Sequence, residues 1–185
     1  MEKSLEVLKG KLLVAMPMLP DPNFRQSVVL MCEHGPEGAL GLVLNRPTEV
    51  AVSVLIEDFP RLAGGEWVYS GGPVAKNGML VLCRGETPFE DHPVLKDVYL
   101  ARDLEKLKMP GALGADGEIR CYLGYAGWAA GQLESEMESG TWRVVPADTA
   151  LIFDADPALL WPQMMRRLGP EWAFYATMPF DPSMN

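Results

Sequence analysis

The stretch Val28–Asn45, VVLMCEHGPEGALGLVLN, contains two apolar segments separated by a short polar loop. The loop His34–Gly38 holds two glycines and a proline, residue types that often interrupt regular structure. Two strand-like segments joined by so short a loop predict a β-hairpin, with strands at Val28–Glu33 and Ala39–Asn45. The fold is therefore expected to be built from antiparallel strands.

Similar segments, rich in Val, Leu, Tyr and Trp, recur between turn signals along the chain. So many short strands predict an extensive, mostly antiparallel sheet. Further strands are expected at Leu12–Met16, Glu66–Ser70, Met79–Arg84, Asp97–Ala101, Ile119–Tyr125, Thr141–Pro146 and Leu151–Phe153.

Helical patterns are fewer, which predicts an α+β fold. The clearest helix is Pro157–Leu168, where Asp156 can cap the first turn and Gly169 follows as a stop. Pro162 inside this helix is expected to kink it or to displace its start toward Trp161. Shorter helices are expected at Val50–Asp58, Asp103–Lys108 and Gly131–Ser139.

The composition, 48% hydrophobic and 22% charged over 185 residues, is typical of a globular protein. Glycine and proline are spread through the turns, which predicts one domain over residues 1–185, and the loop 109–117 is the place where a subdivision could fall. A net charge of −9 disfavours direct binding to nucleic acid or to an anionic membrane surface. The chain has no membrane-spanning apolar run and its start lacks a secretory pattern, so a cytoplasmic location is expected.

The three cysteines, Cys32, Cys83 and Cys121, stand among apolar strand residues and are predicted to be buried free thiols. Cys32 and His34 would face the same side of a strand, so metal or thiol chemistry using a second cysteine is the alternative. No Cys-x-x-Cys, His-x-x-x-His or Gly-x-Ser-x-Gly spacing supports that alternative. The sequence predicts no catalytic residue, cofactor or metal.

The stretch Gly124–Glu134, GYAGWAAGQLE, takes an apolar strand through three glycines into an acidic helical pattern. Backbone N–H groups at such a turn can cradle an anion, but Glu134, Glu136 and Glu138 would repel phosphate. The competing interpretation is a corner whose glycines permit close backbone packing. Trp128 either fills the core or offers an exposed anchor to a partner.

Two other segments combine turn residues with polar groups, Asn45-Arg46-Pro47-Thr48 and Ser70-Gly71-Gly72-Pro73-Val74. Arg46 could pair with a ligand carboxylate or with an internal acid such as Glu134, and the internal pair is favoured.

Taken together, the segments Gly10–Pro47, Ser70–Val74, Gly124–Asp148 and Leu160–Gly169 resemble the YqgE/AlgH family of bacterial proteins. The resemblance covers nearly the whole chain, although relatives commonly carry a histidine where this chain has Cys83. It implies a single α/β domain whose bifurcated, largely antiparallel sheets form a pseudo-barrel flanked by helices. It implies no established enzymatic activity or cofactor, and one member has been associated with transcriptional regulation of exopolysaccharide synthesis.

The sequence favours a non-enzymatic interaction or transcription-regulatory module that binds a protein or a small ligand; no feature selects an oligomeric state. An enzyme using His34, Glu33 and Glu134 is the alternative, which proximity of His34 to Glu134 would favour. Direct DNA binding, suggested only by the family association, is the least favoured. The candidate interaction surface comprises Asn45, Arg46, Pro47, Gly71, Gly72, Pro73, Gly124, Tyr125, Gly127, Trp128, Gln132 and Glu134.

Overall fold

The computed structural model describes residues 7–57, 66–85, 92–101, 103–109 and 111–180. Its strands form a curled sheet in the order β10-β1-β2-β3-β9-β6-β8-β7, with β4 and β5 joined beside β9. All the strand pairs are antiparallel except β5 with β9. The strands are β1 (Lys11–Ala15), β2 (Val28–Gly35), β3 (Gly38–Val43), β4 (Pro47–Ala51), β5 (Trp67–Ser70), β6 (Val74–Arg84), β7 (His92–Leu95), β8 (Val98–Ala101), β9 (Glu118–Ala129) and β10 (Trp142–Pro146).

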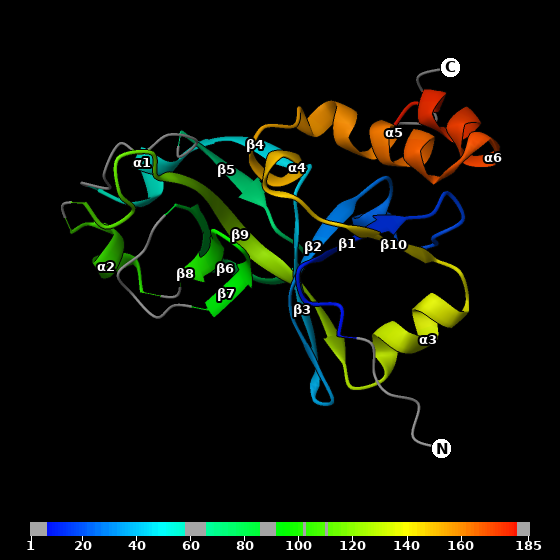
Figure 1. The fold of residues 1–185 in the computed structure, drawn as a ribbon, viewed down its shortest axis with the longest axis horizontal. Helices are drawn as coiled ribbons and strands as arrows, with labels where there is room; N and C mark the ends of the chain where they lie inside the picture. Colours follow the sequence, from blue (N-terminus) through cyan, green and yellow to red (C-terminus); the bar gives the residue numbers. More distant parts are fainter. Residues whose placement is uncertain (1–6, 58–65, 86–91, 102, 110, 181–185) are drawn as a thin grey trace.

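Helices flank this sheet, so the predicted α+β fold with a largely antiparallel, barrel-like sheet is confirmed. Figure 1 shows α5 and α6 beside β1, β2 and β10, with α1 and α2 at the far end near β5 to β8. The helical segments are η1 (Pro22–Phe24), α1 (Val52–Leu55), α2 (Leu104–Leu107), α3 (Gln132–Glu138), α4 (Thr149–Phe153), α5 (Pro157–Leu168), α6 (Pro170–Ala173) and η2 (Phe174–Thr177). Within the described ranges, no helix is long and apolar enough to cross a membrane.

The long strand β9 joins the two halves of the sheet. Its first half pairs with β5 and β6, where Cys121 lies opposite both Val68 and Val81. Its second half pairs with β3, where Ala126 lies opposite Gly41. The sheet therefore divides along β9, as the expected bifurcation requires.

Both faces of the central strands are covered, which explains why β1 and β2 read as continuous apolar runs. Leu12 and Val14 of β1 belong to a core cluster that includes Trp161 of α5. Leu13 and Ala15 point to the other face and belong to a cluster with Trp128, Leu133 and Trp142. Because successive strand residues alternate between faces, a strand buried on both sides needs apolar residues throughout.

The structure corrects several element predictions. Leu151–Phe153 is not a strand but the end of α4, which Asp148 caps by accepting a 2.8 Å hydrogen bond from the Leu151 N–H. Strands β4 and β7 were not predicted, and β4 takes the start of the helix expected at Val50–Asp58. Helix α5 has the predicted bounds and continues through Pro162, so the displaced start is wrong.

Candidate functional site

The predicted corner between strand and helix is confined to Gly131, which lies at the N-cap of α3 with φ = +74°, because Gly124 and Gly127 lie inside β9. Gly71 crosses β9 here, and its N–H donates to the Leu123 carbonyl at 2.8 Å. A Cβ on Gly72 would lie 2.2 Å from the Tyr125 carbonyl carbon, so the two backbones are in direct contact. The close-packing interpretation therefore applies to Gly124, where a Cβ would lie 2.4 Å from the Gly72 carbonyl oxygen.

The exposed-anchor interpretation of Trp128 is wrong, because its side chain is only 5% exposed. Its ring stacks on Phe24, with centroids 6.1 Å apart, and meets Trp142 edge-on at 6.0 Å. The indole N–H groups of Trp128 and Trp142 both donate to Oε2 of Glu136 at 2.9 Å, and Gln132 donates to its Oε1. Of the two interpretations of Trp128, a ring that fills the core and an exposed anchor, the structure supports the first.

The imidazole of His34 contacts Glu134, with Nε2 2.9 Å from Oε1. This proximity is the geometry expected of the enzyme alternative. However, Nδ1 accepts a 3.2 Å hydrogen bond from the backbone N–H of Leu8, and the His34 side chain is only 3% exposed. Both ring nitrogens are occupied, so the pair fixes Leu8 and α3 to β2 and presents no free base to a substrate.

The predicted buried thiols are confirmed: Cys32, Cys83 and Cys121 are buried and form no disulfide. Burial raises the pKa of Cys32 to about 12 and that of Cys121 to about 12. Such thiols stay protonated near neutral pH, which excludes Cys32 as the nucleophile of the thiol alternative. Among the described residues, no group of His, Cys, Asp and Glu side chains could hold a metal ion.

The predicted internal pair of Arg46 with Glu134 is wrong, because Glu134 contacts His34, whereas the described partners of the Arg46 guanidinium are backbone carbonyls and an aromatic ring. The Arg46 guanidinium donates to the carbonyls of Asn45 (3.2 Å) and Arg25, and lies 4.8 Å from the Phe180 ring centroid. Burial lowers the pKa of Arg46, as expected for a desolvated cation. No ion pair joins Arg46 to an acid within the part of the chain that the structure describes.

Arg46 lines a pocket of about 320 Å³. Trp161 and Pro162 of α5 form part of its wall, so the charged group faces a largely apolar surround. This Arg46 pocket is bounded by Gln26, Asn45, Arg46, Pro47, Pro157, Ala158, Trp161, Pro162 and Phe180. Asn45 itself is structural, because its side chain accepts from the Val28 N–H at 3.0 Å and donates to the Gln26 carbonyl at 2.9 Å.

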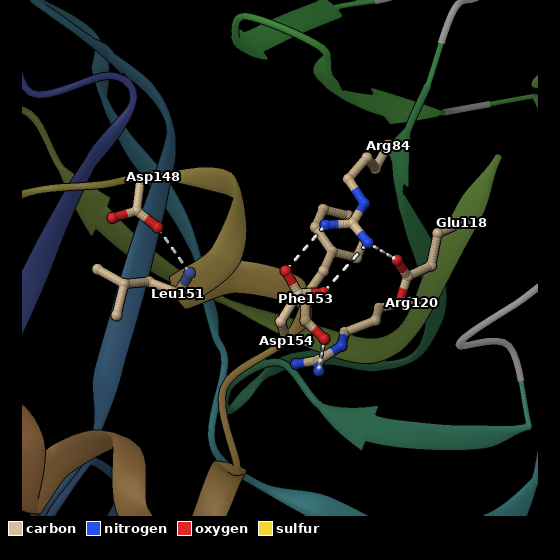
Figure 2. Close-up of polar contacts among 7 residues, drawn as sticks. All are labelled: Arg84, Glu118, Arg120, Asp148, Leu151, Phe153 and Asp154. Atoms are coloured by element: carbon tan, nitrogen blue, oxygen red, sulfur yellow. Dashed lines mark hydrogen bonds and ion pairs between the residues drawn. The ribbon is translucent and has the colours of Figure 1, made fainter. Parts of the chain in front are cut away.

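A second arginine cluster was not predicted (Figure 2). Arg84 of β6 donates to both carboxylate oxygens of Asp154 at 3.1 Å and also to Glu118 of β9. Arg120, only 7% exposed, donates to the Phe153 carbonyl at 2.7 Å. These contacts fix the end of α4 to the sheet. The charge of Arg84 is balanced by two acids, unlike that of Arg46.

The candidate surface of the sequence divides into two places. Trp128 pairs with Ala39 in the β3–β9 ladder, and Asn45 lies six residues beyond Ala39, about 20 Å along the strand direction. Arg46 and Pro47 are therefore at one end of β3, and Gln132 and Glu134 are at the other. Gly71, Gly72, Pro73, Gly124 and Tyr125 lie between these two places, where the segment before β6 crosses β9.

This chain is similar to known proteins over nearly its whole length. The sequence model of the AlgH-like family matches residues 12–173. A UPF0301 protein of Streptomyces avermitilis is 42% identical over 184 residues, covering 96% of this chain and 95% of its own. A UPF0301 protein of Chlorobaculum tepidum is 38% identical over 190 residues, covering 100% of both chains.

Two solved structures have the same fold. The solution structure of the AlgH protein from Pseudomonas aeruginosa has a TM-score of 0.71 and 31% sequence identity, covering 97% of this chain and 98% of its own. The crystal structure of a protein from Corynebacterium diphtheriae has a TM-score of 0.76 and 26% identity, covering 94% of this chain and 93% of its own.

Proposed function

We propose that this chain, which belongs to the AlgH-like family, is a non-enzymatic binding module that recognises an acidic side chain of a partner protein in the Arg46 pocket. The observation that carries the proposal is the half-buried Arg46 guanidinium, which contacts two backbone carbonyls and an aromatic ring but no described acid. A partly buried cation without an anionic partner is destabilised by the loss of hydration, and the carboxylate of a ligand would supply that partner.

The chemistry of the pocket favours a carboxylate over other ligands. A guanidinium has a planar array of N–H donors that matches a carboxylate, and Arg46 uses only some of these donors on Asn45 and Arg25. Pro157, Trp161 and Pro162 line the pocket, and apolar walls beside a charge pair lower the local dielectric constant and so strengthen the pair. An acidic group presented on an apolar segment therefore fits best.

This proposal accommodates a regulatory role without DNA contact. The net charge of −9 opposes approach to a phosphate backbone. A transcription-regulatory effect in the cytoplasm would then be exerted through a protein partner. An electrophoretic shift of DNA at physiological salt by the purified protein would contradict that route.

The contact of His34 with Glu134 is the specific observation that favours an enzyme as the second candidate. For acid–base chemistry, a substrate would have to displace either the Leu8 N–H or the Glu134 carboxylate from the imidazole. The burial of the His34 side chain opposes such access, so the binding module is the better supported function.

The first test of the Arg46 pocket uses a defined acidic probe. We expect the monoanion N-acetyl-glutamic acid α-methylamide to shift the indole N–H resonance of Trp161, which lines the pocket, with saturation in the millimolar range. Arg46→Gln should weaken this binding about tenfold or more, because a charge-assisted hydrogen bond is lost. The measurement is a titration of ¹⁵N-labelled protein followed by heteronuclear NMR.

Two controls decide the outcome. Arg167→Gln makes the same change of charge at an exposed position in the last turn of α5 and should leave the affinity unchanged. The neutral glutamine counterpart of the probe should not bind. Equal shifts from both probes, or unchanged affinity in Arg46→Gln, would exclude carboxylate recognition by Arg46.

A further inference from the structure

We propose that a second pocket, at the opposite end of β3 from Arg46, binds the side-chain guanidinium of an arginine on a partner protein. This pocket has a volume of about 290 Å³ and lies between the η1 loop and α3. The aromatic pocket, as we call it, is lined by Leu19, Pro20, Asp21, Phe24, Gly127, Trp128, Gln132, Glu136, Ser139, Thr141 and Trp142.

The first support is a carboxylate held in place without a counter-charge. Glu136 accepts hydrogen bonds from the indoles of Trp128 and Trp142 and from the amide of Gln132, all neutral donors. The side-chain carboxylate of Asp21, on the other side of the pocket, accepts from Asn23 and from no other residue in the described part of the chain. No ion pair involves either acid within the ranges the structure describes, so their negative charge remains available to a cation.

The second support is the aromatic character of the wall. Phe24, Trp128 and Trp142 are in mutual contact, with centroid separations of 5.6 to 6.1 Å. Phe24 is half-buried, so part of its ring remains accessible at the pocket. Aromatic surfaces attract cations, and a guanidinium both stacks on rings and donates to carboxylates in one plane.

The size and position of the pocket favour one side chain over a larger ligand. Its volume is at the lower limit for small-molecule sites, about 300 Å³. Lysine fits less well, because its compact ammonium is more strongly hydrated and does not stack.

Leu19 lines both this pocket and an intermediate one of about 160 Å³, which shares Gln26, Trp161 and Phe180 with the Arg46 pocket. One partner lying along the η1 loop could therefore reach both sites.

The test uses N-acetyl-argininamide as probe and the indole N–H resonances of Trp128 and Trp142 as readout. We expect saturable shifts of both resonances in the millimolar range, while those of Trp67 and Trp172 stay in place. The neutral isostere N-acetyl-citrullinamide should bind at least about tenfold more weakly, because it lacks the charge. Equal binding of the two probes, or no shift with either, would overturn the proposal. Tighter binding of N-acetyl-lysinamide would overturn the assignment to arginine.

The matched variants are Glu136→Gln and Glu138→Gln, which remove one negative charge from the same helix. Glu136→Gln should weaken the arginine probe about tenfold, whereas Glu138→Gln should not, because Glu138 does not line the pocket. Asp21→Asn, at an exposed position, provides a second variant if Glu136→Gln disturbs the indoles. Unchanged affinity in Asp21→Asn and in a folded Glu136→Gln would exclude the site. Arg46→Gln should leave binding of the arginine probe intact. A negative result at the aromatic pocket would therefore not bear on carboxylate recognition by Arg46.

Discussion

Replacing Gly124 by alanine is expected to lower the free energy of unfolding by more than about 4 kcal/mol or to prevent folding altogether. Gly124 has φ = +71°, where a Cβ costs about 1–2 kcal/mol. The new Cβ would also lie 2.4 Å from the Gly72 carbonyl oxygen and 2.9 Å from that of Val74. Both neighbours are backbone atoms at the crossing of β9, so neither can move without disturbing the pairing of β6 with β9.

Gly131→Ala provides the matched control for this prediction. Gly131 has φ = +74°, but a Cβ there meets nothing within 4 Å. It should therefore show only the backbone strain, about 1–2 kcal/mol. Urea unfolding followed by circular dichroism measures both variants. Similar losses for Gly124→Ala and Gly131→Ala would contradict the close-packing role of the crossing.

Elements with a strong local signal could be predicted from the sequence. The hairpin β2–β3 has a loop of turn residues between two apolar segments, and its pairing extends to Gly35 opposite Gly38. Helix α5 has a capping aspartate at Asp156 and a terminating Gly169. In both cases residues close in sequence determine the structure, so no distant contact is needed to recognise it.

The elements that were missed lack such a signal. In α4 the run Leu151–Phe153 is buried throughout, and a short apolar run does not distinguish a helix from a strand. Strands β4 and β7 are short, contain proline and are largely exposed, so they show no alternating pattern. Their pairing with β5 and β8 defines them, and this pairing is a property of the folded sheet.

The candidate sites depend even more on distant contacts. The sequence marks Arg46 as a polar residue at a strand end, but its stacking on Phe180 joins positions 134 residues apart. The burial of Trp128 likewise depends on Phe24 and Trp142, which come from other elements. A residue type and its neighbours in sequence therefore indicate where polar groups occur, while the fold determines which of them have partners.

Raising the pH from 9 toward 12 is expected to lower the free energy of unfolding, with a slope that approaches about 2.7 kcal/mol per pH unit for the two cysteines together near the middle of this range. Burial raises the pKa of Cys32 and of Cys121 from 9.0 to about 12. In this range the unfolded thiols lose their protons and the folded ones keep them. The unfolded state therefore binds fewer protons, so stability falls as pH rises.

Urea titrations at pH 8 to 10.5 under reducing conditions measure this slope, and the double variant Cys32→Ala/Cys121→Ala is the control. Removing the two sulfur atoms leaves small cavities and lowers stability by a similar amount at every pH. The relevant quantity is therefore how strongly the free energy of unfolding depends on pH, and not its value at any one pH. This dependence should be weaker in the variant. A residual slope is expected there, because burial also raises the pKa of Tyr122. If the variant kept the full wild-type slope, the thiols would not be the groups that the fold holds in their protonated form, and Cys32 would no longer be excluded as a nucleophile.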